Sequence, residues 1–248
     1  MNPLTISVLV LLILAAALLY SSVGHAGASG YLAAMALMGV APAVMKPTAL
    51  TLNILVAAIA TVKFYRAGCF SWSLLWPFAV ASIPCSFIGG AITLPGHLYK
   101  TIVGIVLLFA AYKLFRIARQ AVDVQAALRP VPLLAALLSG GVIGLLAGLT
   151  GTGGGIFLSP LLLFMGWVAI RQASGAAAAF ILVNSIAGLL GNVSSVGALP
   201  ASIFVFAPAA IIGGLIGAEY GSKRLASTNL RRLLAVVLII AGCKLIFA

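Results

Sequence analysis

The short run Gly151-Thr152-Gly153-Gly154-Gly155 contains the residue types that bind an anion through backbone amides. Glycines carry no side chain, so several N–H groups can point into one cavity. A helix that starts near Ile156 would add its positive dipole end. Thr152 and Ser159 add hydroxyl donors. The run therefore predicts a nest for a small oxyanion; the alternative is that its glycines only permit a tight turn between two helices.

Nucleotide-binding loops are excluded by the residues around this run. A phosphate-binding P-loop needs Lys and then Ser or Thr after its last glycine, whereas Ile156 and Phe157 follow here. A dinucleotide fingerprint needs a preceding strand and an acidic residue for the ribose, and neither is present. The glycines therefore belong to another kind of site.

A fainter copy of the run occurs 127 residues earlier, as GHAGASG over residues 24–30. Gly24 aligns with Gly151 and Gly27 with Gly154, whereas His25 stands where the second copy has Thr152. Matched glycines that break two apolar segments are typical of transporters built from repeats. Such irregular backbone is tolerated at membrane depth only where it lines a site.

Each glycine run is followed by a segment that opens with a basic residue, Lys46 in one half and Arg171 in the other. A cation at each end of an anion path is one interpretation, and snorkelling to the membrane surface is the other. Asn53 and Asn184 lie inside these same two segments, where a side-chain amide is costly unless it faces the protein interior. The candidate substrate-binding residues are Gly24, His25, Gly27, Ser29, Lys46, Asn53, Gly151, Thr152, Gly153, Gly154, Gly155, Ser159, Arg171 and Asn184.

The composition predicts that these residues sit in an all-α polytopic membrane protein. The chain is 64% hydrophobic and 6% charged, with a mean hydropathy of +1.28. Residues 1–45 and 172–218 contain no Asp, Glu, Lys or Arg. A spanning helix needs about 20 apolar residues, so each stretch is long enough to cross, or enter and leave, twice.

The net charge of +12 comes from 14 Lys and Arg against only Asp123 and Glu219. Cytoplasmic loops collect basic residues, so this excess needs no nucleic-acid partner. Carriers coupled to protons or cations place carboxylates inside the bilayer, and this chain has almost none to place, which favours an anionic or neutral substrate. We expect Asp123 to lie in a loop and Glu219 to form an ion pair with Lys223, four residues later in the same helix.

The residues give little support for an enzymatic activity, a metal site or a bound cofactor. Aspartyl chemistry needs two membrane carboxylates and zinc proteolysis a HExxH pair, and the chain has neither. Cys69, Cys85 and Cys243 lie far apart without a CxxC spacing. We therefore expect no enzymatic activity, no metal site and no cofactor.

Charges and turn residues divide the chain into two halves, 1–118 and 131–248, joined by a polar cytoplasmic linker at 119–130. Each half has five apolar segments: 3–22, 24–44, 47–66, 70–95 and 98–118, then 131–149, 153–169, 172–195, 199–222 and 230–247. Five is odd, so the halves would be inverted repeats. Their Gly-rich segments are broken or hairpin helices that meet near the midplane. Whether these segments span fully or dip in as hairpins stays open.

The distribution of basic residues supports the odd number of segments. With alternating sides, one face receives 11 of the 14 Lys and Arg, and the other receives Lys46, Lys100 and Lys244. The rich face is cytoplasmic, which puts both termini in the periplasm. Two stripes of small residues also predict close helix contacts and would permit a homodimer: Gly140, Gly144 and Gly148, and Gly213, Gly217 and Gly221.

The GTGGG run followed by Pro160-Leu161, in a duplicated apolar chain of this length, resembles the sulfite exporter TauE/SafE family. The resemblance implies a secondary transporter of the bacterial inner membrane, with export as the expected direction. It also implies a substrate that is a sulfur-containing oxyanion, such as sulfite or a small organosulfonate. A passive anion channel, or a carrier of another small anion, is the alternative. The Gly-rich residues of the family map onto Gly151 to Gly155 and onto residues 24–30, where Ala26 and Ala28 replace two glycines.

Overall fold

The computed structural model describes residues 2–119, 130–193, 199–223 and 228–247, and these residues form an all-helical protein. The predicted fold class is therefore confirmed; of the linker, residues 120–129 lie outside the described residues. The helices, in chain order, are α1 (Pro3–Ser21), α2 (Ala28–Leu37), α3 (Pro42–Arg66), α4 (Trp72–Ala91), α5 (Gly96–Arg119), α6 (Leu133–Thr150), α7 (Gly155–Phe164), α8 (Ile170–Gly191), α9 (Ile203–Lys223) and α10 (Thr228–Phe247).

The order of helix lengths is the same on both sides of the linker: one long helix, one short helix, then three long helices. Among the described residues, six helices are long and apolar enough to cross a membrane: α1, α3, α4, α6, α8 and α9. By contrast, α2 and α7 have ten residues each, or about 15 Å, which is half of a hydrocarbon core. The predicted segments 24–44 and 153–169 are therefore broken: a glycine turn leads into a half-length helix.

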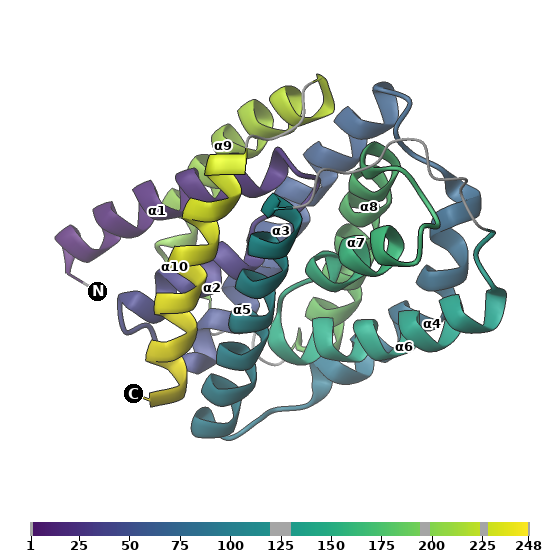
Figure 1. Ribbon diagram of the computed structural model, residues 1–248. Coiled ribbons are helices and arrows are strands. Elements are labelled where there is room, and N and C mark those ends of the chain that lie inside the picture. Colours follow the sequence, from purple (N-terminus) through teal and green to yellow (C-terminus); the bar gives the residue numbers. More distant parts are fainter. Residues whose placement is uncertain (1, 120–129, 194–198, 224–227, 248) are drawn as a thin grey trace.

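Helices from the two sides of the linker pack against each other in pairs (Figure 1). In Figure 1, α5 lies beside α10, α1 beside α9, and α4 beside α6, while α3 and α8 lie in the interior. Leu50 of α3 is next to Gly188, and Asn53, one turn later, contacts Ser185. The contact thus moves backward along α8 as α3 advances, so these two helices cross antiparallel.

The two glycine stripes make the close contacts that the sequence predicts. A Cβ added to Gly213, Gly217 or Gly221 would overlap a carbonyl group of α1 or of the residue that follows α1. Because glycine has no Cβ, α1 and α9 can run parallel in close contact. The stripe of α6 lies in the same way against the carbonyls of Phe78, Ser82 and Ser86 in α4. Helices of the same chain thus cover both stripes, and the homodimer remains a prediction without support from them.

The core is divided around the two half-length helices. One apolar cluster surrounds α2, in which Tyr31 and Met35 are fully buried. A second cluster joins α4, α6, α7 and α8 around Phe78 and Phe180. The start of each short helix is therefore buried in protein, which lets its polar backbone groups lie away from lipid.

Candidate functional site

Both Gly-rich turns need backbone conformations that only glycine adopts without strain. Gly24 and Gly27 have φ of +79° and +110°, and the aligned Gly151 and Gly154 both have +82°. Gly153 adds a third left-handed residue to the second turn, at +73°. Any other residue would be strained at these positions. The glycines are therefore required by the path of the chain.

The turns leave the first amides of α2 and α7 without side-chain caps. Gly27 is the N-cap of α2 and Gly154 the N-cap of α7, and neither can offer a capping oxygen. The first turn of a helix has N–H groups without helical partners, and its dipole adds partial positive charge there. Two half-length helices thus begin with amides available to an acceptor.

The two turns contact each other inside the protein. His25, two residues before the cap of α2, has its Nε2 atom 3.0 Å from the carbonyl oxygen of Gly155, the first residue of α7. Residues 151–156 are buried, and His25 is half-buried. The starts of the two short helices therefore lie together, although 130 residues separate these two groups in the sequence.

The second turn is held near the middle of the long helices. Asn53, close to the centre of α3, donates its Nδ2 hydrogen to the carbonyl of Thr152 at 3.3 Å. Gly153 faces Asn53, Ile181 and Ser185, and a Cβ added to it would lie 2.8 Å from an atom of each. The predicted Asn53 thus contacts the glycine turn directly. Ser185 and Ile181 lie at the same place but carried no sequence motif.

Each turn also packs against the beginning of a long helix on the other side of the linker. Gly24 lies against Ser174, one turn into α8. Gly151 lies against Lys46, one turn into α3. The turns therefore start near opposite ends of the α3–α8 pair and lead toward its middle, where Gly155 meets His25.

Several buried polar atoms around the turns have no hydrogen-bond partner. They include the Oδ1 atom of Asn53 and the Oγ atom of Ser159 in α7. Asn184 donates to the Phe180 carbonyl of its own helix at 2.8 Å, whereas its Oδ1 atom also lacks a partner. Buried polar groups without partners are costly, and such exceptions often mark ligand or water positions. Ser29, another candidate, is buried in the first turn of α2.

The hydroxyl of Thr152 lies 3.0 Å from that of Thr150. Thr150 in turn donates its own hydroxyl hydrogen to the carbonyl of Leu146. Because that hydrogen is committed, the Thr152 hydroxyl donates to Thr150 or to a ligand. Donation to an anion remains a prediction for this residue.

The two basic residues bind helix ends. Lys46 donates its Nζ hydrogens to the carbonyls of Gly89, Gly90 and Ile92, at 3.3, 2.8 and 3.2 Å, where α4 ends. Arg171 donates to the carbonyl of Ser222, where α9 ends. A cation at a helix C-terminus satisfies free carbonyls and complements the dipole. The side chains thus have a structural role that the sequence did not reveal; contact with an anion remains a prediction.

A cavity of about 320 Å³ is lined by Lys46, on which Gly151 of the second turn packs. Lys46 is only 7% exposed, and Asn192, which also lines the cavity, is 3% exposed. Tyr99, a third lining residue, donates its hydroxyl to the carbonyl of Thr150 at 3.0 Å. Lys46 and Tyr99 thus link this cavity to the second turn, through their contacts with Gly151 and Thr150. Tyr99 and Asn192 had no recognisable signal in the sequence.

Comparisons with known proteins match a family and a relative over nearly the whole chain. The sulfite exporter TauE/SafE family matches residues 9–245. A Sinorhizobium fredii protein named probable membrane transporter protein y4hK is 43% identical over 232 residues, covering 93% of this chain and 94% of the relative. No solved structure matches the chain significantly. Among the described residues, no group of three or more His, Cys, Asp and Glu side chains is placed to hold a metal ion.

Proposed function

Because the chain belongs to the sulfite exporter TauE/SafE family, we propose that it exports sulfur-containing oxyanions, such as sulfite or small organosulfonates, as a secondary transporter. Membership makes it a multi-pass membrane transporter and not an enzyme, as the residues led us to predict. We also propose that the protein lies in the bacterial inner membrane.

The observation that carries the proposal is the contact between the starts of α2 and α7 at His25 and Gly155. Both short helices present uncapped amides and positive dipole ends toward this place. The hydroxyl of Thr152 adds a donor beside it, and Asn53 holds this turn through the carbonyl of Thr152. An oxyanion has several acceptor oxygens and a negative charge, so it would accept hydrogen bonds from the free amides and complement the positive helix ends.

Charge supports an anion over a cation at this site. The whole chain has two carboxylates, and Glu219, the one that is described, pairs with Lys63 and Lys223. No carboxylate is therefore described near the turns, whereas buried Lys46 lies beside the adjoining cavity. An anion arriving through this cavity would pass a positive charge before it reaches the amides of the second turn.

We further propose that residues 1–118 and 131–248 are inverted repeats. In such a repeat, α1 corresponds to α6 and α4 to α9. The contact between α1 and α9 then has an equivalent in the contact between α6 and α4, and both contacts occur. The same correspondence turns the contact of α3 with α9 into that of α8 with α4, and it leaves the α3–α8 and α5–α10 pairs unchanged. An odd number of segments in each half would place both termini in the periplasm, with alternating access by movement of one repeat against the other.

Anion binding to the purified protein tests the site. We expect sulfite or a small sulfonate to raise the melting temperature more than chloride at equal ionic strength, and Thr152→Val to reduce this effect. The matched control is Thr101→Val, because Thr101 is a threonine of α5 that bonds only its own helix, at His97. An equal anion response in both variants would exclude the turn as the binding site.

Flux in proteoliposomes tests the transport mode. A carrier should saturate with substrate, and substrate on the far side should accelerate exchange. Flux that grows linearly and shows no such acceleration would instead identify a passive anion channel. A reporter fused at Ala248 should report the periplasm; a cytoplasmic signal would overturn the proposed orientation.

A further inference from the structure

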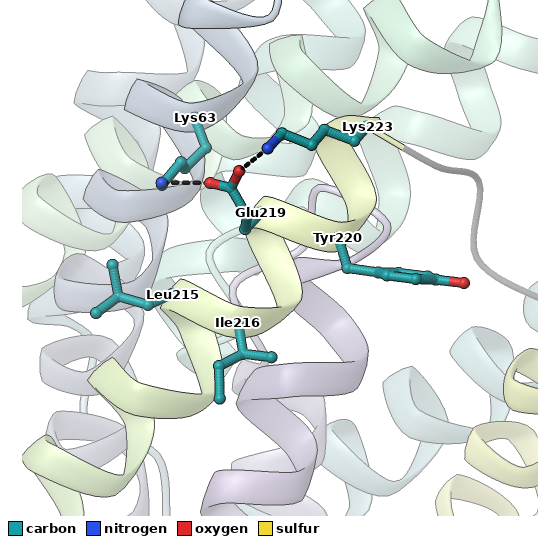
Figure 2. Close-up of a pocket in the computed structure, with 6 residues that line it drawn as sticks. All are labelled: Lys63, Leu215, Ile216, Glu219, Tyr220 and Lys223. Atoms are coloured by element: carbon teal, nitrogen blue, oxygen red, sulfur yellow. Dashed lines mark hydrogen bonds and ion pairs between the residues drawn. The ribbon is translucent and has the colours of Figure 1, made fainter.

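One carboxylate, that of Glu219, holds two lysines at the end of α9 (Figure 2). Lys223 reaches it from one turn later in the same helix, as the sequence predicts. Lys63 reaches it from α3, from a position 156 residues earlier in the chain. Figure 2 shows the two ammonium groups on opposite oxygens of the same carboxylate. Two positive charges and one negative charge leave this cluster with one positive charge in excess.

These three side chains line a pocket of about 490 Å³ together with apolar residues. Leu215 and Ile216 lie one turn before Glu219 and Tyr220, so the apolar part of the pocket is further from the helix end than the charged part. Leu215, Ile216 and Tyr220 are 44%, 54% and 49% exposed. In a membrane-spanning helix, such exposed apolar side chains contact lipid.

The pocket lies on an exposed face of α9. The glycine stripe of α9, which includes Gly217 and Gly221, packs against α1. Ile216 and Tyr220 are neighbours of these glycines in the sequence and project outward from the same helix turns. An occupant of the pocket would therefore lie on the outer surface of the protein, between α3 and α9.

We propose that this pocket binds the phosphate headgroup of an anionic membrane phospholipid, with an acyl chain along Leu215 and Ile216. The excess positive charge lies at the helix end, where headgroups lie, and the apolar lining continues toward the bilayer interior. Basic pockets between transmembrane helices are recognised sites for such headgroups. The half-exposed phenol of Tyr220 matches the preference of tyrosine for the membrane interface.

Lipid affinity should rise or fall with the net charge of the cluster, which a purely structural ion pair would not produce. Glu219→Gln removes the negative charge and leaves both lysines, so the net charge rises from one to two. Lys63→Gln with Lys223→Gln lowers it to minus one. Each charge near a headgroup changes lipid affinity about fivefold. We therefore expect E219Q to bind anionic lipid about fivefold more tightly than wild type, and the double variant much more weakly.

The measurement is lipid retention by the purified full chain, read by native mass spectrometry. Phosphatidylglycerol and phosphatidylcholine with identical acyl chains are compared at equal concentrations. Lys244→Gln is the matched control, because it removes an exposed lysine that bonds Leu37 at the end of α2. If the double variant does not fold, Lys223→Gln alone replaces it, since this side chain is 72% exposed. It should still lower the phosphatidylglycerol preference about fivefold.

Each outcome decides the proposal. A preference for phosphatidylglycerol that falls in the lysine variants, holds in K244Q and rises in E219Q supports it. Equal lipid retention in the lysine variants and K244Q overturns it. Inorganic phosphate that displaces phosphatidylglycerol at similar concentrations would also overturn it, because the site would then belong to a soluble anion.

Discussion

The Nε2 atom of His25 lies 3.0 Å from the carbonyl oxygen of Gly155, and this contact joins the turn before α2 to the first residue of α7. A carbonyl can only accept, so Nε2 carries the proton of this hydrogen bond. The bond holds the starts of two short helices together from distant parts of the chain. This side chain therefore contributes to the relative position of their free amides, together with the packing of each turn on α3 and α8.

Replacement of His25 should separate the two turns. We expect His25→Ala to reduce anion-dependent stabilisation about fivefold, in line with the loss of roughly 1 kcal/mol for one hydrogen bond. His25→Gln restores a donor and should recover part of the effect. Thermal melting with and without sulfite measures both variants. An unchanged anion response in His25→Ala would show that this contact does not organise the site.

The glycines of the turns could be predicted from the sequence because they reflect local backbone geometry. Positive φ at Gly24, Gly27, Gly151 and Gly154 depends on each residue's own lack of a side chain, so matched glycines at a constant spacing revealed two equivalent turns. The half-length helices followed from the same breaks. Segment ends were less predictable, because residues 38–41 and 165–169 are mostly apolar but not helical, so hydropathy did not show where α2 and α7 end.

The contacts between distant residues could not be predicted in this way. The i, i+4 pair of Glu219 and Lys223 was visible in the sequence, whereas Lys63 joins it only because α3 packs on α9. Lys46 was singled out in the sequence as a basic residue that opens the segment after a glycine run. Its carbonyl partners at the end of α4 depend on how two helices meet, which no local pattern encodes.

Substitution of Gly153 by alanine should disrupt the second turn more than its backbone angle alone requires. The added Cβ would lie 2.8 Å from atoms of Asn53, Ile181 and Ser185. Gly166→Ala is the matched control, since Gly166 has a similar φ of +65° and no atom within 4 Å of an added Cβ. The control should cost about 1 kcal/mol for a left-handed alanine, and G153A clearly more. Equal melting temperatures would show that the turn has room for a side chain.

Two helix glycines should respond to alanine in opposite directions. Gly217→Ala would place a Cβ on the carbonyl of Leu18 and push α1 from α9, so the protein should melt at a lower temperature. Gly141 of α6 has its nearest neighbour at 3.6 Å, the Sγ atom of Cys85. Gly141→Ala should therefore be neutral or stabilise by about 0.5–1 kcal/mol through helix propensity. A stable G217A protein would contradict the close packing of α1 on α9.

Lys46 should be required for stability as well as for anion entrance. Lys46→Met leaves the carbonyls of Gly89, Gly90 and Ile92 without their donor, at a cost of about 2 kcal/mol. Lys46→Arg keeps a charged donor and should recover part of the stability. Lys244→Met is the control, because that lysine is exposed and bonds one carbonyl. Thermal melting separates the two roles: K46M should melt lower than K244M even without anion, and sulfite should raise its melting temperature less. If K46M loses stability but keeps the full response to sulfite, Lys46 only caps α4, and the cavity beside it does not lead the anion to the turn.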